Sequence, residues 1–169
     1  MHYEVMGASG FARHAEAALA LRNANLAPPA RDETWMDEFL ADASLAAVCM
    51  FDYNALAGVA WAHTPDATTY PETMYRVAVE PLATPQETVH CSGLHVAPPF
   101  RNMGVGLALA VGLLGTARHA KLATCLLSPN NWPSRHIANA VGMARPMPMM
   151  TTPDGRQLWL KQLNGDMAR

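Results

Sequence analysis

The chain has 169 residues, of which 50% are hydrophobic and 15% charged, and its formal net charge is −2 at pH 7. This length suits one compact domain that buries most of its apolar surface without disulfides or a structural metal, so we expect a single domain over 1–169. The hydrophobic content argues against a disordered chain. Because no block of five or more basic residues occurs, the sequence also argues against nucleic acid as a partner.

Cysteine usage and the amino terminus bear on the compartment. The three cysteines, Cys49, Cys91 and Cys125, form no Cys-x-x-Cys pair, and an odd number is a poor disulfide framework. The amino-terminal sequence lacks the basic and apolar regions of a signal peptide, and no apolar run is long enough to span a bilayer. We therefore expect a cytoplasmic protein that has no membrane partner.

The first part of the chain is expected to form a strand followed by two helices. Alternating residues predict a strand over 2–6, and Ser9 is the expected N-cap of an Ala-rich helix over 11–25. Two prolines then end this helix. Apolar residues at helical spacing predict a second helix over 30–43.

Strand signals dominate the middle of the chain. The runs 45–51 and 56–63 are strand-like, and the four residues between them suit a hairpin turn. A loop over 64–73 leads to a further strand-like run over 74–79, and another strand is expected over 88–96, ended by prolines.

The last part mixes helices and strands. A helix is expected over 105–120, a buried strand over 122–127, and a helix over 133–141 that ends at Gly142. A final hairpin is expected, with strands over 147–152 and 157–163 and a Pro-Asp-Gly-Arg turn over 153–156. This order of elements predicts a mixed α/β (α+β) sheet with helices on both faces.

The stretch LHVAPPFRNMGVGL, residues 94–107, places a glycine-containing loop between a strand and the first turn of a helix. Backbone N–H groups at a helix amino terminus, glycines that allow close approach, and the charge of Arg101 together favour an anion site. One Gly-x-Gly is a weak signal by itself. A Walker loop is excluded because no Gly-Lys-Ser/Thr follows. A dinucleotide-binding loop is excluded because the stretch lacks the third glycine and the downstream acidic residue of that fingerprint.

The segment Arg101-Asn102-Met103-Gly104-Val105-Gly106 resembles the Arg/Gln-x-x-Gly-x-Gly/Ala pyrophosphate loop of the GNAT acyltransferases. The resemblance covers 88–165 well. Leu94-His95-Val96 looks like the fourth strand of that family, 122–128 looks like its fifth, and 131–143 is similar to its Asn-x-x-Ala-x-x-Leu-Tyr-x-x-x-Gly-Phe motif. The half over 1–87 agrees in element order only and corresponds to the variable acceptor side.

The resemblance implies a mixed, mostly antiparallel sheet of about six to seven strands, splayed by a bulge between strands four and five. It also implies acetyl-coenzyme A as the cofactor. Pantetheine would pair with the backbone around Leu94–Val96, and the N–H groups from Met103 to Leu107 would hold the pyrophosphate. Asn131 and Ser134 would contact the pantetheine arm or its thiol end. The implied cofactor residues are Leu94, His95, Val96, Arg101, Asn102, Met103, Gly104, Val105, Gly106, Leu107, Asn131 and Ser134.

An acyltransferase of this type needs a route for the proton of the attacking amine. We predict His90 as the base, because period-2 alternation puts it on one strand face with Leu94 and Val96 and because imidazole titrates near neutrality. His95 points to the opposite face and is the second candidate, and Glu87 could act through water. The alternative for His90, a surface or core-edge histidine without a catalytic task, stays open.

The tyrosine that protonates the departing thiolate in the resembled motif falls on Ala138 in this chain. Ser134, a water or a tyrosine from elsewhere could substitute, since a thiolate can depart without a strong acid. Two functions therefore stay open. One is an acetyl-coenzyme A-dependent N-acyltransferase that acts on a small-molecule amine or a protein amino group; the other is a weak or silent GNAT-like module that binds acyl-coenzyme A or serves a structural role.

Other residues have less specific interpretations. Cys91 could carry an acyl group, although a lone cysteine is more often a small core residue. Five methionines fit core filling or an apolar acceptor channel: Met103, Met143, Met147, Met149 and Met150. No two histidines stand at ligand spacing with a carboxylate, so no metal is expected. A homodimer is compatible with the sequence, and the acceptor cannot be read from it.

Overall fold

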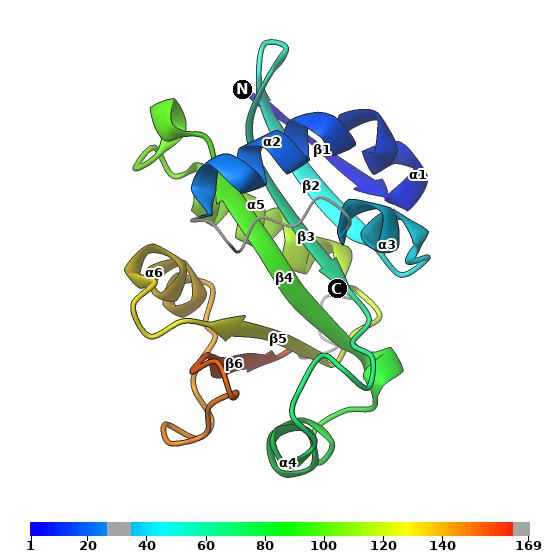
Figure 1. Cartoon of the computed structure of the whole chain (residues 1–169), viewed down its shortest axis with the longest axis vertical. Coiled ribbons are helices and arrows are strands. Elements are labelled where there is room, and N and C mark those ends of the chain that lie inside the picture. Colours follow the sequence, from blue (N-terminus) through cyan, green and yellow to red (C-terminus); the bar gives the residue numbers. More distant parts are fainter. Residues whose placement is uncertain (27–34, 164–169) are drawn as a thin grey trace, which may run out of the picture. The chain divides into compact units, whose positions relative to one another are not determined.

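The computed structural model describes residues 1–26 and 35–163. The prolines expected to end the first helix, Pro28 and Pro29, and the start of the helix expected over 30–43 lie outside this part of the chain. The strands that it contains form one six-stranded sheet of order β1-β2-β3-β4-β5-β6 (Figure 1). β4 and β5 pair in parallel, whereas the pairs β1–β2, β2–β3 and β5–β6 are antiparallel. The predicted mixed, mostly antiparallel sheet is confirmed.

The chain divides into two compact units. The first contains Met1–His63 and Gly93–Thr116, and the second contains Thr64–Ser92 and the chain from Ala117 onward. Strand β4 (Thr88–Val96) contributes its first residues to the second unit and its last residues to the first. Among its described helices, the chain has none that is both long and apolar enough to cross a membrane.

The first unit is a three-layer arrangement around β2 and β3. Helices α1, α2 and α3 lie on one side of these strands, and α5 lies on the other (Figure 1). The elements are β1 (His2–Gly7), α1 (Ala8–Phe11), a 3₁₀ turn (Ala12–His14), α2 (Ala15–Asn25), α3 (Trp35–Ala41), β2 (Ala46–Asp52), β3 (Ala55–His63) and α5 (Val105–Thr116).

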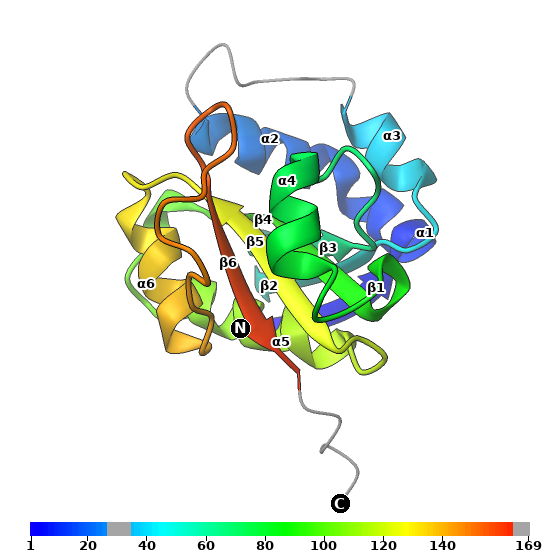
Figure 2. The same cartoon turned by 90° about the horizontal axis from the view of Figure 1, so that it is seen from below.

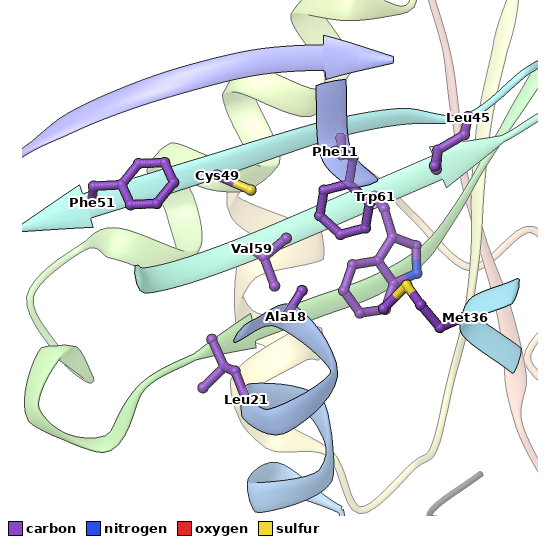
Figure 3. Close-up of a cluster of buried hydrophobic side chains, with 10 residues drawn as sticks. Phe11, Ala18, Leu21, Met36, Leu45, Cys49, Phe51, Val59 and Trp61 are labelled. Atoms are coloured by element: carbon purple, nitrogen blue, oxygen red, sulfur yellow. The ribbon is translucent and has the colours of Figure 1, made fainter. Parts of the chain in front are cut away.

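Both faces of β2 and β3 are buried, which explains why their sequences are almost wholly apolar. On the side of α2, a cluster joins helix residues such as Phe11 and Ala18 to Val59 and Trp61 of the sheet (Figure 3). On the side of α5, the backbone of Gly112 lies close to Val48. The hairpin predicted between the two strands is confirmed.

Gly93 on β4 is packed directly against the indole of Trp61, which is only 3% exposed. A Cβ atom on Gly93 would lie 2.1 Å from Cε2 of that ring. We expect Gly93→Ala to lower the free energy of unfolding by about 1–3 kcal/mol, the usual cost of overpacking a core. Chemical denaturation measures this. Gly115→Ala is the matched control, since a Cβ there meets nothing within 4 Å, and equal stability of the two variants would show the prediction to be wrong.

The second unit is built around the antiparallel pair β5 (Leu122–Leu127) and β6 (Gln157–Gln162). Figure 2 shows this pair flanked by α4 (Glu72–Met74), which continues as a π-helical turn (Tyr75–Val79), and by α6 (Trp132–Ala140). Leu122 and Leu158 of the strands pack with Met74 and Val79. Cys125 points away from this cluster, and its sulfur lies 3.6 Å from that of Met143.

The strand predicted over 74–79 is wrong, because this segment is helical. Its β-branched and aromatic residues favour a strand locally. Met74, Ala78 and Val79 are nevertheless the residues that become buried, at the four- and five-residue spacing of one helix face, where they cover Leu122 and Leu158. Burial against the sheet therefore overrides the local preference.

Other details also differ from the prediction, among them that the helix predicted over 11–25 is divided by the 3₁₀ turn Ala12–His14. Ser9 is not an N-cap, since the first helical residue is Ala8 and its N-cap, Gly7, makes no side-chain cap bond. α5 ends at Thr116 rather than at 120. The hydroxyl of Thr116 donates to the Leu113 carbonyl at 2.7 Å. The strand expected over 147–152 is reduced to one bridge between Thr151 and Gln157, although the predicted turn is present and closed by a 2.8 Å bond from Thr152 N to Arg156 O.

Candidate functional site

The glycine loop of the first unit enters α5 through two residues of left-handed backbone. Asn102 has φ +63° and Gly104 has φ +81°. The Gly104 carbonyl accepts from Ala108 N at 3.0 Å, so the helical hydrogen bonds start at this glycine. The N–H groups of the first turn, from Val105 to Leu107, therefore have no helical carbonyl to donate to. No atom lies within 4 Å of a Cβ placed on Gly104, so an anion can approach the backbone there.

Arg101 is held at the start of this loop. Its Nη2 donates to Oδ1 of Asn25, and its Nε lies 3.4 Å from the Val96 carbonyl oxygen, to which Asn25 Nδ2 also donates at 3.3 Å. The end of α2, the end of β4 and the loop are thus joined through one asparagine. Sequence reasoning missed Asn25, because it stands in a different helix, far from the loop along the chain.

The strand end Leu94–Val96, expected to pair with pantetheine, is half-buried. The carbonyl of Val96 already accepts from two side chains, and the next residue, Ala97, donates its N–H to Ala57 O at 2.9 Å. The last residue of the strand is therefore firmly fixed to its surroundings. Pairing with pantetheine remains a prediction for this backbone.

His95 lies against Trp61, with ring centroids 5.1 Å apart. Burial and, to a smaller extent, the nearby charge of Arg22 together lower the pKa of His95 to about 4. This imidazole is therefore neutral near pH 7. A neutral, half-buried ring that lies tilted against tryptophan is a packing element of the first unit, and a base that accepts a proton at neutral pH is not expected from it.

His90, in the second unit, is 6% exposed and belongs to a buried polar cluster. Its Nδ1 lies 3.0 Å from Thr124 Oγ1 and 3.3 Å from the Tyr70 hydroxyl, and the two hydroxyl oxygens are 2.5 Å apart. His90 and Thr124 are also the last register pair between β4 and β5, although both described strands continue beyond it. The cluster therefore stands where the parallel pairing ends, as expected for a sheet that splays between these strands.

Tyr70 and Thr124 were missed by sequence reasoning. Burial raises the pKa of Tyr70, so its hydroxyl keeps its proton near neutral pH. Tyr70 comes from an irregular segment, and Thr124 from a buried strand that otherwise consists of apolar residues and one cysteine. A threonine inside such a strand is the one signal that could have pointed to a buried polar cluster.

Glu87 is committed to structural contacts. It caps a short 3₁₀ turn (Pro85–Glu87) by accepting from Thr84 N at 3.2 Å, and it pairs with Lys121. The Lys121 hydrogen bond and the Thr84 N–H hold the pKa of the Glu87 carboxyl below its usual value, which weakens it as a base. Its action through water remains a prediction.

Asn131 and Ser134 are brought together at the start of α6. Asn131 is the N-cap, and its Oδ1 accepts from Ser134 N at 3.2 Å. Further along the same helix Ala138 is 4% exposed. Its carbonyl accepts from Met143 N, after the helix has ended at Ala140 and the chain has turned through Gly142, which has φ +82°. Ala138 is thus buried, and a tyrosine at this position would add its ring to a packed interior.

The three cysteines are free thiols. Burial raises the pKa of Cys91 and that of Cys49 to about 12, so neither is a thiolate near neutral pH. This argues against acyl-cysteine chemistry at Cys91. Between residues 1–26 and 35–163, no group of three or more His, Cys, Asp or Glu side chains could hold a metal ion.

The methionines divide between the two interpretations offered for them. Met143 is 5% exposed and lies against Cys125, whereas Met103 is 60% exposed and Met149 is 93% exposed. An open pocket of about 750 Å³ in the second unit is lined by Pro71, Thr73, Met74, Met147, Met149, Met150, Thr151, Thr152 and Pro153. Core filling holds for the buried methionines, and an apolar ligand surface remains a prediction for the others.

The sequence matches no protein-family model and no curated protein. Solved structures are similar over almost the whole chain. One, from Desulfovibrio desulfuricans, is assigned to the GNAT family of acetyltransferases (TM-score 0.70, 15% identity, 95% of this chain and 98% of that one). A second is the aminoglycoside acetyltransferase AAC(6')-Iy with a bisubstrate analogue, CoA-S-monomethyl-acetylneamine (TM-score 0.64, 21% identity, 90% of this chain and 97% of that one). A third is the PaiA N-acetyltransferase of Thermoplasma acidophilum in complex with coenzyme A (TM-score 0.62, 10% identity, 96% of this chain and 100% of that one).

Proposed function

We propose that this chain, which has the fold of the GNAT acyltransferases, binds acetyl-coenzyme A and transfers its acyl group to an amine. The observation that carries the proposal is the loop before α5, where Gly104 has φ +81° and an open approach to the backbone. The whole chain would act as one acyltransferase domain, with the acceptor side in 1–87 and the cofactor side in 88–165. Cysteines without disulfides support a cytoplasmic location.

The pyrophosphate would accept hydrogen bonds from the backbone N–H groups between Met103 and Leu107. Arg101 would add its positive charge, which the Asn25 contact keeps beside the loop. The side-chain amide of Asn131 and the hydroxyl of Ser134 would donate to the pantetheine arm. Since Asn131 uses its Oδ1 as the helix cap, its Nδ2 is the group proposed for that contact.

The reaction forms a C–N bond between the amine and the acyl carbon and breaks the C–S bond of the thioester. The amine loses one proton, and the coenzyme A thiolate finally gains one. We propose His90 as the base that takes up the amine proton. Because Ala138 replaces the tyrosine of the resembled motif, the thiolate would depart without help from that position.

For His90 to accept a proton at Nε2, its Nδ1 has to carry the other proton. The cluster supports this tautomer: Nδ1–H can donate to Thr124 Oγ1 at 3.0 Å, and Tyr70 can donate to the same oxygen at 2.5 Å. Thr124 then has the Val89 carbonyl, at 3.4 Å, as the acceptor for its own proton. In the opposite arrangement Thr124 donates to Nδ1, and Nε2 is already protonated.

Nitrogen-15 NMR of the histidine side chains tests this assignment without any assay of turnover. We expect the neutral His90 ring to carry its proton on Nδ1, with the resonance assigned by its loss in His90→Gln. Thr124→Val should remove the preference for this tautomer, because the acceptor of the Nδ1 proton is gone. A proton on Nε2 in the native protein would overturn His90 as the base.

The acceptor is proposed to be a small-molecule amine, which the AAC(6')-Iy complex with an acetylneamine analogue supports. A protein amino group is the other candidate. The test is release of coenzyme A from acetyl-coenzyme A, measured with a panel of aminoglycosides, alkylamines, arylalkylamines and peptides with a free amino terminus. We expect saturable release with at least one class. Buried Ala138 favours the second function, a silent module, and binding of acetyl-coenzyme A with no release for any amine would establish that module instead.

A further inference from the structure

Strand β1 presents an apolar stripe to solvent. Tyr3 is 65% exposed and Val5 is 54% exposed. In the β1–β2 register Val5 lies opposite Val48, and Val48 faces the α5 backbone at Gly112. Residues directly opposite in an antiparallel pair share a face of the sheet. Tyr3 and Val5 therefore lie on the face of the sheet that α5 covers, at the edge beyond β2.

Helix α5 carries a second apolar surface next to that stripe. Its sequence, VGLALAVGLLGT, contains no charged residue, and it buries Val105, Leu109 and Leu113 in the first unit. The outer face exposes Leu107 and Val111, one helical turn apart, together with smaller residues. A helix that is apolar on all sides is normally covered on all sides. The α5 outer face and the β1 stripe are thus two uncovered apolar surfaces on the same side of the sheet in the first unit.

β1 is also an edge strand, because it ends the sheet order and pairs, within the described chain, with β2 alone. Its outer row of N–H and C=O groups can pair with another strand. On the face opposite Tyr3, the strand carries His2 and Glu4, whose Nε2 and Oε1 atoms are 3.7 Å apart. His14 also lies near Glu4, with its Nε2 3.8 Å from Oε2.

We propose that β1 and the α5 outer face form an interface with a second copy of this chain. The two β1 strands would pair antiparallel about a twofold axis, centred on Tyr3. This register puts His2 opposite Glu4 of the partner subunit on one face, so that an imidazole and a carboxylate meet twice. On the other face Tyr3 meets Tyr3 of the partner subunit, and both α5 helices lie on that same side.

Charge selects this register over its neighbour. If the pairing were centred on Glu4, two carboxylates would stand directly opposite each other, which destabilises an antiparallel pair. The partner is therefore identified by a palindromic pattern: a strand that offers His2 to Glu4 and Glu4 to His2, with an apolar stripe behind. A second copy of this chain has that pattern, and a twofold contact of this kind uses the outer row of β1 in both copies, so that no third copy can add at β1.

Sedimentation equilibrium over a concentration series tests the proposal. We expect a reversible dimer for the native protein, and a dissociation constant raised at least about tenfold, or roughly 1.4 kcal/mol, by Glu4→Lys, which replaces the carboxylate opposite His2 by an ammonium group. The double variant His2→Glu with Glu4→Lys exchanges the charges and should restore the dimer. Glu16→Lys, the same charge change at an exposed position of α2, should leave the dimer intact.

The register has its own readout. Tyr3→Cys should form an intersubunit disulfide under mild oxidation, since the two Cβ atoms would stand about 4.5–5.5 Å apart, whereas Val5→Cys should form much less. Circular dichroism of each variant confirms folding. A native protein that stays monomeric at millimolar concentration, a dimer that ignores Glu4→Lys, or equal crosslinking at the two positions would each overturn the proposal. None of these results depends on acyl transfer.

Discussion

Replacing Gly104 by valine should abolish the rise in melting temperature that acetyl-coenzyme A produces in the native protein. A ligand that binds only the folded state stabilises it by mass action, by about 2.7 kcal/mol at one hundred times its dissociation constant. At Gly104 the branches of valine would fill the open approach to the backbone, and φ +81° is unfavourable for a β-branched residue. Differential scanning fluorimetry with and without acetyl-coenzyme A measures the melting temperature of the native protein and of Gly104→Val.

Gly155→Val is the matched control for this variant. Gly155 has φ +82° and, like Gly104, no atom within 4 Å of an added Cβ, but it lies in the turn before β6. Both substitutions should cost about 1–3 kcal/mol through backbone strain. Only the variant at Gly104 should lose its response to the ligand, and a retained rise there would remove this loop from the binding site.

Replacing His90 by glutamine should lower turnover near neutral pH by about 10²–10⁴-fold, the usual contribution of a general base. Cofactor affinity should change little, because the proposed phosphate contacts come from the loop before α5. The loss of turnover should appear in kcat, measured by coenzyme A release with the best acceptor of the panel. Melting temperature is measured alongside, since His90 is buried and its bond to Thr124 is lost.

His95→Gln is the control for His90→Gln. His95 is already neutral near pH 7, with its pKa lowered to about 4 by burial, and it packs on Trp61. We expect lower stability and nearly native turnover per folded molecule. Equal turnover in the two variants would exclude His90 as the base and would direct attention to Glu87, whose carboxylate would have to act despite its Lys121 pair.

Much of the fold could be predicted from local patterns. The apolar runs of β2, β3 and β5 and the alternation in β1 were sufficient for the strands, and Gly142 and Pro153–Arg156 marked real turns. The strand predicted over 74–79 was wrong because burial against the sheet, rather than local preference, decided that this segment is helical. The strand at 147–152 was wrong because a good turn signal does not ensure that both of its arms pair with the sheet.

The candidate site was predicted where it depends on contiguous residues. The loop before α5 combines its glycines, its arginine and the helix start in one stretch, and this pattern is visible in the sequence. Asn25, Tyr70 and Thr124 could not be found in this way, since their contacts arise from the packing of α2 and from the β4–β5 register. Those contacts now give Arg101 a fixed position and His90 two hydrogen-bonding partners.

The central claim is that this chain binds acyl-coenzyme A through the loop before α5. Isothermal titration of acetyl-coenzyme A into the native protein tests it most directly. We predict saturable binding at one site per chain, lost in Gly104→Val and kept in Gly155→Val. The absence of any binding at millimolar ligand, in a protein that unfolds cooperatively in the same buffer, would contradict the claim.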